Sequence, residues 1–268
     1  MVENRSIRWS DVLAAEWLKI RSVRSTRHLL VALVLILVGA AALAWYAASA
    51  FDSLTPERRA RFVLSPLDQV VALPVQICVA VLGILTIAAE YTTGSIRTSL
   101  TAVPRRGRVL AAKALLTAGI ALVVGQLTGF GVAVVSRLVV GDRPMGFNTA
   151  PLADDVPLLL ATGVTTAVVA VVGVGLGTVL RGSVGPVVIV VALLYVVPIL
   201  AQALPSPVDA WVSALLPGAL PGQLVGIANE GHSVYQDMLS PLGALAVLLA
   251  YPVAALVPAA VLLRRRDA

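Results

Sequence analysis

The stretch from Leu29 to Ala50 reads LLVALVLILVGAAALAWYAASA and carries no charged side chain over its 22 residues. About 20 consecutive apolar residues are enough for an α-helix to cross the hydrocarbon core of a bilayer. The rest of the chain has the same character, because 59% of its 268 residues are hydrophobic and 13% are charged. A soluble core of this length could not bury so much apolar surface. The sequence therefore predicts an all-α, polytopic membrane protein.

Five similar stretches follow, which makes six predicted spanning helices. The six stretches are residues 29–50, 70–89, 114–135, 156–180, 185–204 and 239–263. Pro252 and Pro258 interrupt the last one, but neighbouring helices can satisfy the carbonyls that a proline leaves free. No Ser- or Pro-rich linker, acidic run or fixed-period repeat divides the sequence. We therefore expect residues 1–268 to form a single membrane domain with a cytoplasmic tail at 1–28.

The basic residues divide unequally between the two sides of the predicted bundle. The N-terminal tail, the loop after the second span, the turn after the fourth span and the C-terminus carry 15 of the 20. Because cytoplasmic segments are enriched in Lys and Arg, both termini are predicted to be cytoplasmic in a multi-pass plasma-membrane protein. The charges fall between apolar runs, so the net charge of +6 does not indicate a nucleic-acid partner. Ala48-Ser49-Ala50 resembles a signal-peptide cleavage site, but the charged leader and the apolar run are both too long for a signal peptide.

Residues Trp9 to Arg21 predict an amphipathic helix before the first span. Apolar residues recur at helical spacing on one face, namely Trp9, Val12, Leu13, Trp17 and Ile20. Asp11, Lys19 and Arg21 lie off that face. The two tryptophans favour a helix lying at the inner membrane surface over a basic tail that only sets the orientation.

The segment from Glu90 to Arg108 is longer than a connection between antiparallel spans requires. It begins with an acidic residue, breaks at Gly94, continues for the length of a short helix and ends at Pro104-Arg105-Arg106. The carboxylate of Glu90 is expected to cap the start of that short helix. Two interpretations stay open: the segment contacts a cytoplasmic protein, or its arginines only set the orientation and bind anionic lipid.

Several classes of membrane protein are excluded or disfavoured by what the sequence lacks. A P-loop needs a lysine directly after glycine, but Lys19 follows Leu18 and Lys113 follows Ala112. The chain is therefore not predicted to be an enzyme that hydrolyses ATP. Glu90 and Lys113 are placed at span ends, so no ionisable residue is expected well inside a span. Ion-coupled carriers depend on such buried groups, which disfavours a self-powered carrier.

Glycines and uncharged polar residues inside the spans indicate helix packing. Gly125-x-x-x-Gly129 and Gly173-x-x-x-Gly177 permit close approach of helices, without indicating the partner helix. Most of the in-span polar side chains are expected to form hydrogen bonds between helices; they are Gln76, Thr86, Gln126, Thr128, Thr162, Thr165, Thr166 and Gln202. A single cysteine excludes an internal disulfide and a cysteine cluster, and no metal or cofactor is predicted to bind this chain.

Two stretches resemble the ABC-2 type permeases, the membrane subunits of one class of ATP-binding cassette exporters. The first is Glu16-Trp17-Leu18-Lys19-Ile20-Arg21-Ser22-Val23-Arg24-Ser25, followed by a span. The second and more specific one is Ala89-Glu90-Tyr91-Thr92-Thr93-Gly94-Ser95-Ile96-Arg97, followed by Pro104-Arg105-Arg106 and Lys113. Six spans, inner termini and a long outer segment before the last span also fit this family.

The resemblance implies an architecture like that of the type V exporters and a set of contact residues. The tail would be a connecting helix that contains Trp9, Glu16, Trp17, Lys19 and Arg21. A coupling helix between spans two and three would contact the ATPase, within the set Glu90, Tyr91, Thr93, Gly94, Ser95, Ile96, Arg97, Pro104, Arg105 and Arg106. A substrate path would run along a dimer interface near spans two and five, where Gln76, Thr86 and Gln202 are candidates.

The family also implies partners and an activity. Two copies, or one copy and a related permease, would dimerise, each bound by an ATP-binding cassette subunit that supplies the site for ATP and Mg²⁺. The expected function is export of a small amphipathic or hydrophobic compound such as a drug, an antibiotic or a lipid. The alternative is a non-transport membrane anchor or assembly subunit that uses the same inner loop to dock a cytoplasmic protein.

Overall fold

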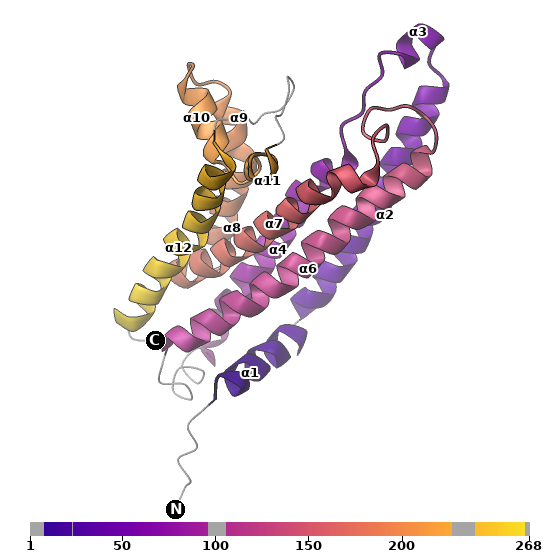
Figure 1. The fold of residues 1–268 in the computed structure, drawn as a ribbon. Helices are drawn as coiled ribbons and strands as arrows, with labels where there is room; N and C mark the ends of the chain where they lie inside the picture. The colour runs from indigo at the N-terminus through magenta and orange to yellow at the C-terminus, as the bar shows by residue number, and fades with distance from the viewer. Residues whose placement is uncertain (1–7, 23, 96–105, 227–238, 266–268) are drawn as a thin grey trace, which may run out of the picture.

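The computed structural model describes residues 8–22, 24–95, 106–226 and 239–265, and within these ranges the regular structure is helical (Figure 1). The helices in chain order are α1 (Trp9–Ser22), α2 (Arg24–Asp52), α3 (Pro56–Arg59), α4 (Leu67–Thr93), α6 (Arg106–Val140), α7 (Leu152–Leu180), α8 (Val184–Val191), the π-helical turn η1 (Ala192–Val196), α9 (Val197–Ala201), α10 (Val208–Leu215), α11 (Leu220–Val225) and α12 (Pro241–Arg265). One isolated bridge pairs Leu64 with Gly146.

Six helices in the described ranges are long and apolar enough to cross a membrane, which confirms the predicted number of spans. They are α2 from His28 onward, α4, α6, α7, the continuous unit α8–η1–α9, and α12. The largest difference concerns the third span, which begins at Arg106 instead of residue 114 because the helix continues through Arg106-Gly107-Arg108. With 35 residues, α6 is about 52 Å long. It is therefore longer than the hydrocarbon core, which is about 30 Å thick.

The central helix of the bundle is α7, against which α4, α6 and α12 pack. A Cβ atom on Gly173 would lie 2.5 Å from the carbonyl oxygen of Ala80 in α4, so the close approach of these two helices requires glycine. A Cβ atom on Gly125 of α6 would lie 3.1 Å from the Cβ of Thr166 in α7. Gly175 faces α12, and the short helix α11 packs against both α7 and α12. The predicted glycine pairs thus serve the α4–α7 and α6–α7 contacts.

The polar side chains inside the spans bond differently from the prediction. The threonine hydroxyls donate to a carbonyl three or four residues earlier in their own helix, as seen for Thr86, Thr128, Thr162, Thr165 and Thr166. In an apolar environment a hydroxyl forms its hydrogen bond most readily in this way, because a backbone carbonyl of its own helix is always within reach. Gln126 does bond between helices, with Nε2 donating to the carbonyl of Leu160 in α7 at 3.1 Å. The prediction is wrong for the threonines and confirmed for Gln126.

The two ends of the bundle are built differently. In Figure 1, α1 and the last turn of α12 lie at one end, and α3 and α10 lie at the other. At the α3 end, Phe51, Phe62 and Met145 form an apolar cluster that joins the chain after α2 to the chain after α6. An exposed ion pair between Arg143 and Asp52, at 2.8 Å, lies beside it. At the α1 end the contacts are charged and buried.

Candidate functional site

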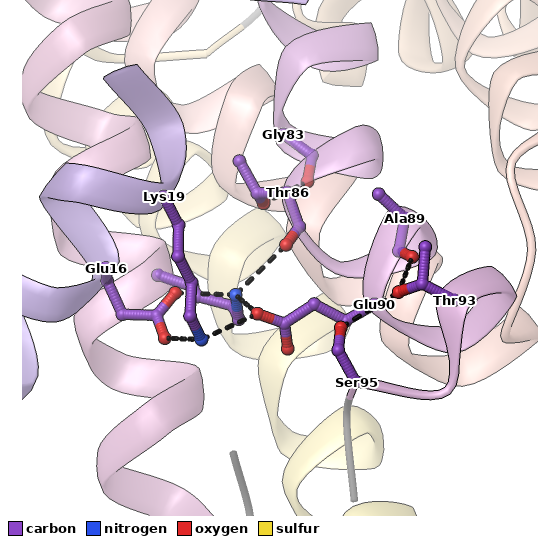
Figure 2. A network of polar contacts seen from close by, with 9 residues as sticks. Glu16, Lys19, Gly83, Thr86, Ala89, Glu90, Thr93 and Ser95 are labelled. Carbon is purple, nitrogen blue, oxygen red and sulfur yellow. Dashed lines mark hydrogen bonds and ion pairs between the residues drawn. The ribbon is translucent and has the colours of Figure 1, made fainter. Parts of the chain in front are cut away.

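Four charged side chains from three helices meet at the α1 end of the bundle, and Figure 2 labels three of them, Glu16, Lys19 and Glu90. Glu16 and Lys19 come from α1, Glu90 from the last turn of α4 and Lys113 from α6, and we call these four residues the charged cluster. Lys113 Nζ lies 2.6 Å from Glu16 Oε2 and 2.8 Å from Glu90 Oε1. Lys19 Nζ lies 2.7 Å from Glu16 Oε1 and 2.9 Å from Glu90 Oε1. Each lysine therefore bridges the same two carboxylates.

Three of the four members are removed from water. Lys113 is 1% exposed, Glu16 3% and Glu90 7%, whereas the side chain of Lys19 is 42% exposed. The Nζ of Lys113 also donates to the carbonyl of Thr86 at 3.0 Å, so its three N–H groups have three acceptors. Two lysines and two glutamates sum to zero charge. Removal of Lys113 would leave two buried carboxylates without a buried cation, and a buried charge that loses its partner costs about 3–5 kcal/mol in proteins.

Lys19 keeps its proton in this setting. Partial burial lowers the pKa of its ammonium group, but hydrogen bonds and charge attraction from Glu16 and Glu90 outweigh that effect. The net result is a pKa above the usual value for lysine, so Lys19 is positively charged at physiological pH.

The face of α1 that meets the bundle was only partly predicted. Val12, Glu16 and Ile20 follow one another at four-residue spacing, and all three are buried where α1 packs against α6. Trp9 and Trp17 were assigned to the same face as Val12 and Ile20, but they are 40% and 46% exposed. A glutamate, not a tryptophan, therefore occupies the middle of the buried stripe. Arg21, another member of the expected connecting helix, is exposed.

One expectation about the charged residues is wrong. Lys113 is the eighth residue of α6, because α6 begins earlier than hydropathy indicated, and its place at the end of the membrane span stays a prediction. The expectation for Glu90 is the one that is wrong. Glu90 lies inside α4, which continues to Thr93, and its Oε1 binds the two lysines instead of capping a following helix. Its second oxygen, Oε2, is buried and has no hydrogen-bond partner within the described part of the chain.

The other residues expected to couple to an ATPase lie on both sides of the 96–105 segment. Thr93 Oγ1 bonds to the carbonyl of Ala89 at 2.8 Å and to Ser95 Oγ at 2.9 Å. Gly94 ends α4 with a φ of 70°, a left-handed conformation that suits glycine. The remaining predicted residues Ile96, Arg97, Pro104 and Arg105 lie outside the described residues.

Tyr91 and Arg106 connect the ends of α4 and α6 to other helices. The ring of Tyr91 packs on a cluster that includes Ile87 of α4 and Leu263 of α12. The guanidinium of Arg181, which follows α7, lies 5.6 Å from the centre of that ring, a cation–π geometry. Arg106 Nη1 donates to the carbonyl of Leu263 at 2.9 Å, which ties the start of α6 to the last turn of α12.

The three candidates for a substrate path are not gathered in one place. Gln76 is buried in α4, ten residues before Thr86, which corresponds to about 15 Å along the helix. Thr86 contributes its carbonyl to the charged cluster. Gln202 follows α9 and is exposed.

Two important residues were not recognised from the sequence. The sequence analysis placed Lys113 at a span end and in a family motif without assigning it a partner, although a lysine inside the run Ala111-Ala112-Lys113-Ala114-Leu115 itself indicates a buried partner. Arg181 was counted only among the basic residues that set the orientation. No local pattern indicates its contact with Tyr91, because 90 positions separate the two residues.

A family model described as ABC-2 family transporter protein matches residues 12–198. The chain belongs to this family. A search of curated proteins finds no match. The matched region covers most of the chain and contains all four members of the charged cluster as well as Tyr91 and Arg181. As an ABC-2 permease the protein is a membrane subunit without an ATPase domain, so it is not itself an enzyme, and its family implies an ATP-binding cassette partner.

Proposed function

We propose that this permease, together with an ATP-binding cassette subunit, exports a small amphipathic or hydrophobic compound, such as a drug, an antibiotic or a lipid, across the plasma membrane. In this proposal the 94–105 segment is where the ATPase docks, and the charged cluster is the first element that passes its motion into the bundle. The observation that carries the proposal is the position of the cluster. It binds α4 and α6 to each other and to α1, just inside the two helix ends that flank the docking segment.

The geometry explains why force on that segment would act on several helices at once. Lys113 Nζ, on α6, donates hydrogen bonds to Glu90 of α4 and to Glu16 of α1. Arg106, at the start of α6, donates a hydrogen bond to a carbonyl at the end of α12. A network of buried, charge-assisted hydrogen bonds resists distortion more than exposed contacts do. The ends of α1, α4, α6 and α12 are therefore expected to move as one unit.

Two features support a cytoplasmic position for this end. The N-terminal tail, the loop between α4 and α6, the turn after α7 and the C-terminus all belong to it, and these segments carry most of the basic residues. On α6, Lys113 and Arg137 are 24 residues apart, or about 36 Å. This spacing matches a hydrocarbon core of about 30 Å, so both groups can reach an interface.

Dimerisation is a second component of the proposal. An ATPase engine of this type uses two cassette subunits, and the proposed docking segment occurs once in this chain, between α4 and α6. Two copies, or one copy and a related permease, are therefore expected to form the working unit. Spans two and five would line the substrate path between them, with Gln76, Thr86 and Gln202 as candidate contacts.

The proposal can be tested with a conformational reporter that requires no identified substrate. The permease is purified with its co-expressed ATP-binding cassette subunit in nanodiscs, with Cys78→Ala and Gln202→Cys, which places a reporter thiol after α9. The labelling rate by a membrane-impermeant maleimide is then compared with and without ATP, Mg²⁺ and vanadate. A transporter changes the exposure of this outer position during its ATP cycle. An anchor subunit binds the ATPase but gives the same labelling rate in both conditions, and that result would contradict the proposal.

The substrate class is tested separately. Inside-out vesicles that contain the complex are supplied with ethidium or with a fluorescent phospholipid analogue. ATP-dependent accumulation or flipping of either probe supports export of an amphipathic compound. If neither probe is transported by a complex that shows ATP-dependent labelling at position 202, this substrate class is excluded, while the proposed transport function still stands.

A further inference from the structure

Arg181, at the turn between spans four and five, has an unusual backbone conformation. Its φ of 54° and ψ of 28° lie in the left-handed region, and within the described residues it is the one non-glycine residue with a positive φ. Left-handed geometry is unfavourable for a residue with a Cβ atom. A glycine, Gly182, comes next and would adopt such a conformation without cost, yet it has no positive φ, and Arg181 is the residue that ends α7 in the left-handed conformation. A residue held in an unfavourable conformation points to a role for its side chain.

The side chain of Arg181 reaches the end of a different helix. Its guanidinium lies 5.6 Å from the centre of the Tyr91 ring, in the last turn of α4. Tyr91 directly follows Glu90 of the charged cluster and precedes the docking segment by three residues. The ring of Tyr91 packs on a separate, apolar cluster to which α4, α6, α7 and α12 all contribute. Arg181 therefore joins the turn between spans four and five to the helix end that carries Glu90.

Span five is held to the bundle along a narrow side. Val190 and Leu194 are 2% and 3% exposed where they pack with Ala80 and Ile84 of α4. Most of its remaining surface faces outward, and Val188, for example, is 61% exposed. The helix also changes to π-helical geometry over Ala192–Val196, a local irregularity that is often found at functional sites. A helix packed in this way can pivot about the short turn that begins with Arg181.

Spans four and two, by contrast, are fixed to each other. A Cβ atom on Gly177, one turn before Arg181, would lie 2.8 Å from Ile87 Cγ2, and Gly173 contacts α4 in the same way. Spans two and four are therefore packed tightly as far as Ile87 and Gly177. Tyr91 and Arg181 lie one helical turn beyond this contact, where the chain leads into span five.

We propose that Arg181 is a positioning residue that transmits motion from the base of α4 to span five through the ring of Tyr91. When the ATPase moves the docking segment, Tyr91 moves with it. The guanidinium on the ring then reorients the turn, and span five pivots on α4. The inference rests on the proposed function, because it assumes that an ATPase moves the docking segment.

The test uses the same complex and the same labelling reporter at Gln202→Cys, which lies at the far end of span five from Arg181. Tyr91→Leu removes the ring and keeps apolar packing, and Arg181→Ala removes the cation. Both should retain ATPase co-purification and lose the ATP-dependent change in labelling. Tyr91→Phe and Arg181→Lys keep a ring and a cation, and each should preserve that change. The double variant Tyr91→Leu/Arg181→Ala should be no worse than either single variant, since the two remove one interaction.

Arg181→Gly separates the transmitting role from a merely structural one. Glycine relieves the unfavourable conformation, so the melting temperature of the complex should stay the same or rise. The ATP-dependent change in labelling should still be lost. If Arg181→Gly or Arg181→Ala responds to ATP as the parent does, the inference is wrong and the proposed function stands. If the parent complex itself shows no ATP-dependent change, the proposed function fails first, and the inference fails with it.

Discussion

The two ends of the bundle carry ion pairs of very different kinds, and α6 runs from one end to the other. Near its start, Lys113 lies within 3 Å of two carboxylates, with side-chain exposures of 2% for Lys113, 4% for Glu16 and 9% for Glu90. Just past its other end, Arg143 pairs with Asp52, whose side chains are 36% and 53% exposed. Exposed pairs contribute little to stability, whereas a buried charge that loses its partner is costly. The buried ion pairs at the α1 end therefore fix the helices in one arrangement, whereas the exposed ion pair at the α3 end contributes little to stability.

The largest effect is expected for Lys113→Met, which leaves the carboxylates of Glu16 and Glu90 facing each other without a buried cation. The loss should be about 3–5 kcal/mol of folding free energy. Thermal unfolding in detergent, followed by size-exclusion chromatography, measures it. Lys113→Arg keeps the charge in a larger side chain and should lose less. If Lys113→Met had the same melting temperature as the wild type, the charged cluster would not stabilise the fold.

Glu16→Gln should have the next largest effect, and its effect should be local. The change removes the charge that fixes α1 while leaving the Glu90–Lys113 pair between α4 and α6 in place. Hydrogen bonds to charged groups contribute about 1.5–3 kcal/mol, so amide exchange in α1 should be roughly ten- to hundredfold faster. Hydrogen-exchange mass spectrometry checks this, with peptides of α7 as the internal reference. Uniformly faster exchange across all helices would contradict a role confined to α1.

Arg137, at the opposite end from Lys113, is less exposed than Arg143 and more exposed than Lys113. Its side chain is 17% exposed and bonds to Asp155 at 2.5 Å and to the carbonyls of Phe147 and Ala150. Arg137→Gln should cost about 1–3 kcal/mol, mostly from carbonyls that lose their donor. Faster amide exchange should be restricted to residues 141–155. If Arg137→Gln and Lys113→Met lost equal amounts of folding free energy, the two ends of the bundle would not differ in how charge stabilises them.

Asp52→Asn should have the smallest effect. The pair with Arg143 is open to water, so its attraction is screened by solvent and salt. The melting temperature should stay within the scatter of replicate measurements, in low salt and in about 0.5 M NaCl alike. A clear loss of stability in Asp52→Asn would mean that the α3 end is held by charge after all.

Hydropathy predicted six spans because the requirement for a long apolar run is local and strict. The first turns of α6 escaped prediction for the same reason, since Arg106 and Arg108 are polar yet helical. The charged cluster could not be derived from spacing. Glu16 and Lys113 are separated by 97 positions, and their contact depends on how α1 folds back on α6. Hydrophobicity alone does not distinguish a face that meets protein from one that meets lipid, so the burial of Val12 and Ile20 and the exposure of the α1 tryptophans could not be predicted.

If the charged cluster transmits ATP-driven motion, Glu90→Ala should interrupt that transmission. This variant removes one of the two negative charges of the charged cluster, at the helix end beside the docking segment. Membrane insertion, co-purification of the ATPase and ATP-dependent labelling at Gln202→Cys are measured side by side, with Asp52→Ala as a matched carboxylate deletion at the opposite end. We expect normal insertion in both variants and loss of the ATP-dependent labelling change in Glu90→Ala alone. Normal labelling and normal co-purification in Glu90→Ala, at normal expression, would show that this end of the bundle is an ordinary connection.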